Sequence, residues 1–317
     1  QQQQLDESVN DSEPEIVPRF TIQNRKTFKS KVPINIPEGV NNAWITETLV
    51  FDNIIAVSCG STHNVGLKKD GRAFSWGSSI YDQYESPEDV ELVDIIDIKC
   101  GQGHSVALKE DGTVITWGNN EYEQRNISGG TDLSNIKSIA CGFNHTIGLK
   151  HDGTVVSWGN NDNGQQVFME DVKLENIKKI FCGGFHNVAI KEDGTVIAWG
   201  SNEFDQCNLP INGELKDVVD IACGRFHNIA LKKDGTAVIW GNRSFEQDRT
   251  YEQKLENIKS IASGENHSVA LKNDGTMLIW GAKEKNQLNI PTDIKLENIQ
   301  FIACGDDHTV AIQNITT

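Results

Sequence analysis

The sequence lacks several features that would place it in common functional classes. It has no run of about 18 consecutive apolar residues, the length a membrane-spanning helix needs, so we expect no membrane segment. It is also poor in positive charge, with 29 lysines and arginines against 45 aspartates and glutamates and a net charge of −16. Because phosphate binding depends on clustered Lys and Arg, this composition argues against a nucleic-acid partner.

Motifs for catalysis are missing as well. The sequence contains no Gly-x-Ser-x-Gly elbow, no Walker-type loop and no Cys-x-x-Cys pair. A catalytic site needs several unlike groups that converge on one point, whereas the polar residues here recur at regular intervals along the chain. We therefore expect no enzyme activity, no catalytic residue, no cofactor and no small-molecule substrate.

What the chain does contain is a recurring stretch, best seen at Ile139–Gly159. An apolar run ends in Cys141-Gly142, and His145 opens a segment of alternating character. The pair Asp152-Gly153 then suits a tight hairpin turn, which needs positive φ at its centre. A further short strand ends at Trp158, so the stretch predicts β-structure throughout.

This stretch occurs seven times, with its histidines at steps of 41, 41, 41, 41, 40 and 41 residues. A Gln follows seven residues after each Trp of the pattern. A fixed period of this length built from short strands is typical of a propeller, in which each repeat is one blade. We predict an all-β, seven-bladed β-propeller. The repeated residues are His63, His104, His145, His186, His227, His267 and His308, and Trp76, Trp117, Trp158, Trp199, Trp240 and Trp280.

The two ends of the chain are expected to meet. The seventh repeat stops at Ile312 without an Asp-Gly turn or a Trp-Gly strand. An N-terminal strand should complete it and close the ring, because closure removes exposed sheet edges. Aligning Pro33 with Pro210 places Phe20 and Ile22 at the positions of Ile197 and Trp199.

We divide the chain into a disordered acidic tail at residues 1–18 and a single propeller domain at residues 19–317. An insertion of 13 residues, at about 38–50, separates the first strand from the first full repeat. It contains Trp44, which either packs on the first blade or anchors a partner.

Six of the seven cysteines occupy one position of the repeat, where Ser263 replaces the seventh, and Cys207 lies outside the pattern. Equivalent positions on neighbouring blades should lie about 10 Å apart, beyond disulfide reach. We expect free, buried thiols, which favour a reducing, intracellular compartment, cytoplasm or nucleus. No secretory leader is visible, but the chain starts at Gln1 without Met, so a removed leader peptide stays open.

The repeated histidines and tryptophans are interpreted as structural. One His per blade forms a wide ring, whereas zinc needs ligands about 2.0 to 2.1 Å from one ion, so we expect no metal site. Hydrogen bonds from each imidazole to nearby backbone are the favoured explanation.

The positions at which the repeats differ carry the functional prediction. Strand counting places the Gly-x-x-His turns and the loops after Trp-Gly on one face, which should be rich in aromatic and acidic residues. Aromatic anchors among polar residues are typical of protein-binding patches, although the Phe rings could instead fold into the channel mouth or between blades. The predicted partner-binding residues are Tyr81, Tyr122, Phe143, Phe185, Phe204, Arg225, Phe226, Phe245, Glu265, Asp306 and Asp307.

The repeat, Cys-Gly-x-x-His followed by Lys-x-Asp-Gly-Thr, Trp-Gly-x-Asn and Gln, resembles that of the regulator of chromosome condensation family. The resemblance implies a seven-bladed propeller closed by its N-terminal strand. The founding member exchanges nucleotide on the small GTPase Ran through a projecting wedge and docks on nucleosomes with a basic tail. Here the even spacing leaves no room for a wedge after the first blade, and the tail is acidic. Other members are ubiquitin-ligase accessory modules, and one is a secreted β-lactamase inhibitor that grips its target with loop aromatics.

From these observations we predict a non-enzymatic interaction or assembly module that binds a macromolecular partner, a protein, through the loop face described above. The alternative is a guanine nucleotide exchange factor for a Ran-like small GTPase. A further alternative is a chromatin-associated or structural particle component.

Overall fold

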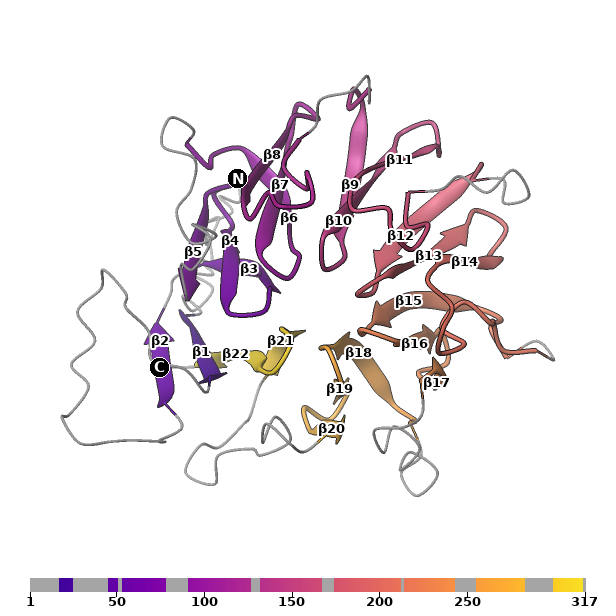
Figure 1. The fold of residues 1–317 in the computed structure, drawn as a ribbon. Coiled ribbons are helices and arrows are strands. Elements are labelled where there is room, and N and C mark those ends of the chain that lie inside the picture. Colours follow the sequence, from indigo (N-terminus) through magenta and orange to yellow (C-terminus); the bar gives the residue numbers. More distant parts are fainter. Residues whose placement is uncertain are drawn as a thin grey trace, which may run out of the picture.

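The computed structural model describes residues 17–24, 45–50, 53–77, 91–126, 132–166, 174–211, 214–242, 255–282 and 299–315. Within these ranges the chain forms 22 strands. No helix long and apolar enough to cross a membrane is found there. The strands belong to six three-stranded sheets and one four-stranded sheet, which stand around a common centre (Figure 1). The fold is therefore a β-propeller, and the all-β prediction is confirmed.

The six three-stranded sheets follow one another along the chain. They comprise β3 (Ile54–Cys59), β4 (His63–Lys68) and β5 (Ala73–Gly77); β6 (Ile95–Cys100), β7 (His104–Lys109) and β8 (Val114–Gly118); and β9 (Ile136–Cys141), β10 (His145–Lys150) and β11 (Val155–Gly159). The next three comprise β12 (Ile177–Cys182), β13 (His186–Lys191) and β14 (Val196–Gly200); β15 (Val218–Cys223), β16 (His227–Lys232) and β17 (Ala237–Gly241); and β18 (Ile258–Ser263), β19 (His267–Lys272) and β20 (Met277–Gly281).

Each repeat folds as the turn chemistry predicts. In the third repeat, β10 pairs antiparallel with β11, with His145 opposite Gly159 and Leu149 opposite Val155. The connecting turn holds Gly153 at a φ of 84°, a region glycine enters without steric cost. The carboxylate of Asp152 accepts a hydrogen bond of 2.9 Å from the backbone N–H of Thr154. Asp supplies the turn's hydrogen bond and Gly its dihedral angle.

The core lies between neighbouring sheets. One cluster joins Leu149 and Val155 of the third repeat to Ile177 and Trp199 of the fourth. Because both faces of the middle strands are covered, five of the six residues of β10 are buried. The first strands also contact one another in sequence around the centre, and β21 (Ile299–Cys304) contacts β3. The repeats therefore bury their apolar side chains only by standing next to one another.

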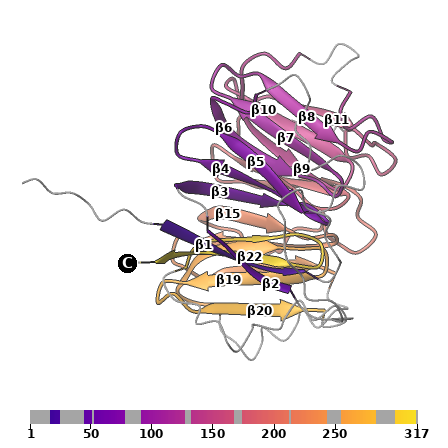
Figure 2. The ribbon, with the colours of Figure 1, turned by 90° about the vertical axis from the view of Figure 1, so that its left-hand side faces the viewer.

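The four-stranded sheet joins the two ends of the chain in the order β2-β1-β22-β21. Strand β1 (Val17–Asn24) pairs antiparallel with β22 (Thr309–Ile315), and the side view shows them adjacent (Figure 2). The predicted register is wrong by one position, because Phe20 lies opposite Ile312 where the alignment required Ala311. The alignment relied on Pro33 and so on loop lengths, which do not constrain strand register.

Two further boundaries differ from the sequence prediction. Strand β1 begins at Val17, opposite Ile315, so the last two residues assigned to the acidic tail are part of a sheet. Residues 45–50 of the expected insertion form β2, which pairs with β1 along its whole length. Residues 1–16 and Trp44 lie outside the described residues.

The sequence pattern also predicts a last strand after the Gln of each repeat. In the fourth repeat residues 204–211 and 214–217 form turns, bends and irregular chain instead. In the other repeats this segment falls wholly or partly outside the described ranges. The loop after β14 instead forms part of the surface that carries Phe204.

Candidate functional site

The repeated histidines connect each sheet to the next. Each Nε2 atom lies 2.7–3.0 Å from the side-chain oxygen of the residue that directly follows the histidine of the next repeat. The expected bonds to backbone are therefore corrected: the partner is always a Ser, Thr or Asn side chain. The pairs are His63–Ser105, His104–Thr146, His145–Asn187, His186–Asn228, His227–Ser268, His267–Thr309 and His308–Asn64.

Each imidazole packs on the glycine three positions before it, which explains the Gly-x-x-His spacing. A Cβ atom at Gly142 would lie 2.0 Å from Cε1 of His145 and 2.6 Å from the carbonyl oxygen of Gly183. Burial lowers the pKa of His145 to about 4, although its bond to Asn187 favours the charged form. This imidazole is therefore neutral at neutral pH, and a structural role for the repeated histidines stays a prediction.

The Gln of the repeat holds the loop after Trp-Gly. In the fourth repeat the Oε1 atom of Gln206 accepts a hydrogen bond of 2.8 Å from the backbone N–H of Phe204. The carbonyl oxygen of Gln206 accepts a second, of 3.1 Å, from the indole of Trp240 in the next sheet. The Gln side chain thus shapes its own loop while its backbone anchors the following sheet.

The strand count correctly places two sets of loops on one face. The N–H of Ser201, after Trp199, donates to the carbonyl of Phe185 at 2.9 Å. The N–H of Asn242, after Trp240, donates to the carbonyl of Phe226 at 2.8 Å. We call the surface formed by the Gly-x-x-His turns and the loops after Trp-Gly the partner face.

Four predicted aromatic residues on this face touch one another. The ring centroids of Phe143 and Phe185 lie 5.3 Å apart, those of Phe185 and Phe226 6.0 Å, and those of Phe204 and Phe226 4.4 Å. The guanidinium of Arg225 lies 4.9 Å from the centroid of Phe226 and 5.7 Å from those of Phe143 and Phe185. We call these five residues the aromatic-arginine cluster.

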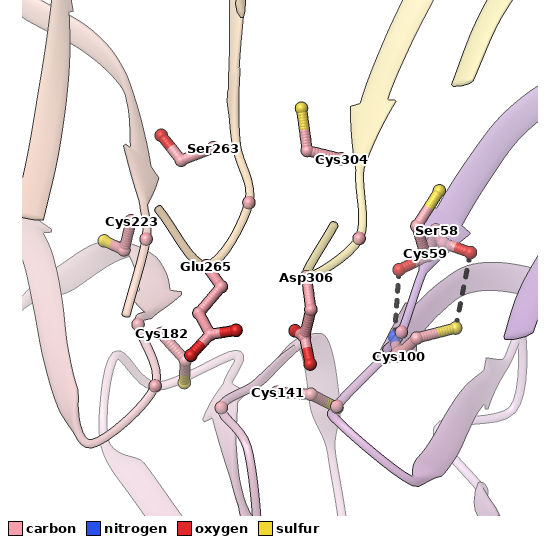
Figure 3. Close-up of a pocket in the computed structure, with 18 of the residues that line it drawn as sticks. Ser58, Cys59, Cys100, Cys141, Cys182, Cys223, Ser263, Glu265, Cys304 and Asp306 are labelled. Carbon is pink, nitrogen blue, oxygen red and sulfur yellow. Dashed lines mark hydrogen bonds between the residues drawn. The ribbon is translucent and has the colours of Figure 1, made fainter. Parts of the chain in front are cut away.

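The cluster borders the mouth of a central cavity of about 320 Å³. Phe143 lines this cavity, as the alternative interpretation of the Phe rings proposed, but it remains half-buried rather than enclosed. Glu265 and Asp306 project into the cavity (Figure 3). Arg225 forms an ion pair with Glu265, which ties the acidic mouth to the cluster.

Asp306 has an unusual environment for a carboxyl group. Burial, and secondarily the charge of Glu265, raise the pKa of Asp306 to about 7. The amide of Gln102 donates to it at 3.5 Å, and hydrogen bonding by Ser61 also favours the charged form. The mouth of the cavity therefore changes charge near neutral pH.

The repeated cysteines line the same cavity. All seven cysteines of the chain are free thiols, as expected from the spacing. Only Cys59 is fully buried, however, and the other six are partly exposed, so their description as core residues is corrected. For the five of these that belong to the repeat, the cause is their place at the end of the first strands, which face the central cavity (Figure 3). Burial among other protein atoms raises the pKa of Cys100 to about 11 and that of Cys304 to about 12.

The remaining predicted residues are dispersed. Tyr122 lies exposed in the loop of the second repeat, where its N–H donates to Gln124 at 2.8 Å. Asp307 is half-buried beside the last two histidines; burial lowers the pKa of both to about 4, and the charge of Asp307 partly opposes this shift. Tyr81 and Phe245 lie outside the described residues. Among the residues the structure describes, no group of three or more His, Cys, Asp or Glu could hold a metal ion.

The structure adds residues that the sequence did not single out. Gln102 reaches Asp306 across the mouth of the cavity, and Ile211 stands exposed beside the loop of Phe204. Ile211 follows Pro210 in a segment that does not form a strand. An isolated apolar residue after Pro was therefore the sequence signal that could have identified Ile211 as exposed.

Comparisons with known proteins agree with this geometry. A family model described as the RCC1-like domain matches residues 46–314. Among curated proteins, none matches the chain.

Several solved structures share the fold. Prp20p of Saccharomyces cerevisiae is 21% identical, with 83% of each chain covered and a TM-score of 0.65; it was described with its binding properties to Gsp1p and histones. Human WBSCR16 is 17% identical, covering 95% of this chain and 100% of that chain with a TM-score of 0.69. The ectodomain of the Arabidopsis thaliana receptor kinase ACR4 is 22% identical, covering 77% and 83% with a TM-score of 0.56. At these identities the likeness concerns the fold alone.

Proposed function

Because the chain belongs to the RCC1-like domain family, we propose that it is a non-enzymatic interaction or assembly module that binds a protein through the partner face. The aromatic-arginine cluster is the observation that carries this proposal. Aromatic residues and Arg supply most binding energy at protein interfaces, where they sit in packed patches depleted of other charges. The cluster gathers five such residues from three neighbouring repeats.

The cluster is also ordered before any partner arrives. Its rings pack on one another, and Arg225 is held between them by its ion pair with Glu265. Immobilising a flexible side chain on binding usually costs about 0.5–1.5 kcal/mol. A patch that is already ordered avoids most of this cost. Phe204, 39% exposed, and Tyr122, 45% exposed, offer the free ring surface that a partner would cover.

The absence of enzyme activity is part of the proposal. Each of the seven repeated histidines uses its Nε2 atom in a bond to the next repeat, which leaves none of these atoms for acid-base work. A hydrolase or transferase panel that showed turnover abolished by a partner-face variant would contradict this part.

We further propose that the propeller has seven blades and that its N-terminal strand closes the ring. The pairing of β1 with β22, the contact of β21 with β3 and the bond from His308 to Asn64 support this closure. A chain truncated before residue 25 should then melt at a lower temperature and associate through its exposed edge. An unchanged melting temperature would contradict closure by this strand.

The binding proposal is tested by affinity capture from the native source followed by quantitative binding. We expect the captured protein to bind the double variant Tyr122→Ala/Phe204→Ala at least tenfold more weakly than the wild type. Both side chains are exposed, so the melting temperature should hardly change.

A matched control removes an exposed apolar side chain elsewhere. Ile96, 50% exposed, belongs to the first strand of the second repeat and lies at the end remote from the Gly-x-x-His turn. Ile96→Ala should bind the captured protein as the wild type does. Equal binding by the double variant and the wild type would overturn the proposed use of the partner face.

Nucleotide exchange on a Ran-like GTPase is the alternative function. Prp20p is the relative whose description names binding to Gsp1p, and the 21% identity extends only the fold to this chain. We expect release of labelled GDP from a panel of small GTPases to stay at its intrinsic rate. Accelerated release at catalytic amounts of the protein would favour the alternative.

We propose an intracellular location, cytoplasm or nucleus. The seven free thiols support it, because secreted proteins commonly oxidise such cysteines. Fractionation of the native source tests this, and recovery of the protein from the extracellular fraction would contradict it.

A further inference from the structure

A second concave surface borders the aromatic-arginine cluster. It is an open groove of about 700 Å³ between the loop after β14 and strand β17. We call it the acidic groove. Its volume falls within the range of about 300–1,000 Å³ in which ligand sites occur.

The groove combines apolar walls with an acidic rim. Phe204, Pro210 and Ile211 lie on one side, and Ile239 and Trp240 lie on the other. Ile211 is 75% exposed, the largest exposed fraction among the large apolar side chains that the structure describes. Covering such a side chain contributes on the order of 1.5–3 kcal/mol, so the groove offers a gain to any segment that fills it.

The charge of the lining has one sign. Glu203, Asp205 and Glu214 line the groove, and none of the described residues that line it is Lys, Arg or His. All three carboxylates are exposed. Exposed charges of one sign raise the local concentration of oppositely charged segments and weaken with salt.

The walls are held in place by the loop's own hydrogen bonds. The amide of Asn208 donates to Asp205 at 2.6 Å, and the N–H of Cys207 donates to Asn202 at 2.9 Å. The indole of Trp240 donates to the carbonyl of Gln206, which joins the two sides of the groove. The groove therefore exists before a ligand binds.

We propose that the acidic groove binds an extended peptide segment in which Lys or Arg alternates with apolar side chains. The apolar side chains cover Ile211, Phe204 and Trp240, and the basic side chains meet Glu203 and Glu214 on the rim. The open shape suits a chain segment that enters and leaves the groove, rather than an enclosed small molecule. This inference rests on the proposed function and specifies the chemistry of the partner.

Phe204 makes the groove continuous with the cluster. Its ring contacts Phe226 on one side and lines the groove on the other. One partner can thus place a folded surface on the cluster and a basic strand in the groove. Two linked contacts bind more tightly than either alone, because the second forms at a high effective concentration.

The test uses three fluorescent peptides and the full chain. The first alternates Arg with Leu, the second replaces each Arg with Glu, and the third replaces each Leu with Ser. We expect saturable binding of the first peptide by fluorescence anisotropy, weakened at higher salt, and at least tenfold weaker binding of the other two.

Variants separate the groove from general charge attraction. The double variant Glu203→Lys/Glu214→Lys and the single variant Ile211→Ser should each bind the first peptide at least tenfold more weakly than the wild type. Glu110→Lys/Glu192→Lys is the matched control, because both glutamates are exposed beside Asp-Gly turns and the change in net charge is the same. Equal weakening by the control, or equal binding of the Glu peptide, would overturn the proposal.

The outcome is distinguishable from a failure of the proposed function. Tyr122→Ala alters the partner face without altering the groove lining, and it should leave peptide binding unchanged. Loss of peptide binding in the Glu203→Lys/Glu214→Lys variant with retained partner capture would leave the proposed function standing and place the partner's main contact on the cluster. Absence of any binding of the first peptide to the wild type would overturn the groove proposal alone.

Discussion

The Nε2 atom of His308 donates a hydrogen bond of 2.9 Å to the side-chain oxygen of Asn64, 244 positions earlier in the chain. The same bond joins consecutive repeats everywhere else, across 41 or 42 positions. Because the first repeat supplies the acceptor for the last, the seven bonds form a closed cycle. The contribution of one such bond to the stability of the fold can therefore be measured by replacing its two side chains.

Breaking the bond between His308 and Asn64 should destabilise the protein. Asn64→Ala leaves a buried imidazole nitrogen without its acceptor, which costs about 1–3 kcal/mol. Urea unfolding of Asn64→Ala, His308→Ala and the double variant measures the coupling between the two side chains. The exposed His151→Ala is the control and should change stability by less than about 0.5 kcal/mol. Strictly additive single effects would contradict a direct bond.

Two glycines of the repeat should respond differently to alanine. At Gly142 the new Cβ would lie 2.0 Å from Cε1 of His145. We expect this clash to lower the free energy of unfolding by about 3 kcal/mol or more, at or above the top of the usual range for an overpacked core. At Gly194 an added Cβ would have no atom within 4 Å other than those of its chain neighbours. Only the φ of 84° then opposes alanine, which should lower the free energy of unfolding by about 1–2 kcal/mol. Thermal unfolding of both variants compares packing with backbone strain. Equal melting temperatures would show that the imidazole can move aside.

Acid should unfold the protein steeply. The buried histidines have pKa values lowered to about 3 or 4, so the unfolded chain binds more protons than the folded one below pH 6.5. Each such histidine then lowers the free energy of unfolding by about 1.4 kcal/mol per pH unit, and several act in parallel. Circular dichroism should show an acid transition well above pH 4 that His151→Gln does not shift. A native spectrum at pH 4 would contradict these protonation states.

Ionisation of Asp306 should lower the stability of the folded protein as pH rises. Its carboxyl has a pKa raised to about 7 in the folded protein, against 3.8 as its ordinary value. The folded state therefore binds the extra proton, and its stability falls through this group as pH rises from about 4 to about 7. Asp306→Asn should gain stability over the wild type by more at pH 8 than at pH 5, up to about 1.4 kcal/mol per unit of pKa shift. The same difference at both pH values would show that the carboxyl titrates normally.

The repeat architecture was accessible from the sequence because its cause is local. Asp152-Gly153 specifies a hairpin turn by itself, and its recurrence at a constant spacing needs no knowledge of distant contacts. The placement of Phe185 and Phe226 on the face that carries the loops after Trp-Gly followed from counting strand reversals. Their mutual contact through Arg225 did not, because it depends on rotamers set across three repeats.

The histidine partners were missed although the sequence contained a signal. The residue after each repeated His is always Asn, Ser or Thr, as at Asn64, Ser105 and Thr146, within a strand that is otherwise apolar. A buried polar side chain requires a partner, and the next repeat supplies it. The register of β1 had no such signal, because a shift of one residue preserves every turn and changes only which face each side chain occupies.

Each of the seven repeated imidazoles bonds to the next repeat around the ring, and for His308 the next repeat is the first one. A unit that carries both the reaching His and the receiving Asn, Ser or Thr is interchangeable with its neighbours. Duplicating or deleting such a unit leaves no donor and no acceptor unmatched at the junction. The wedge angle at which adjacent sheets pack, rather than this bonding rule, therefore sets how many units complete a circle. A lineage of such proteins can lengthen or shorten by whole modules while each junction stays chemically the same.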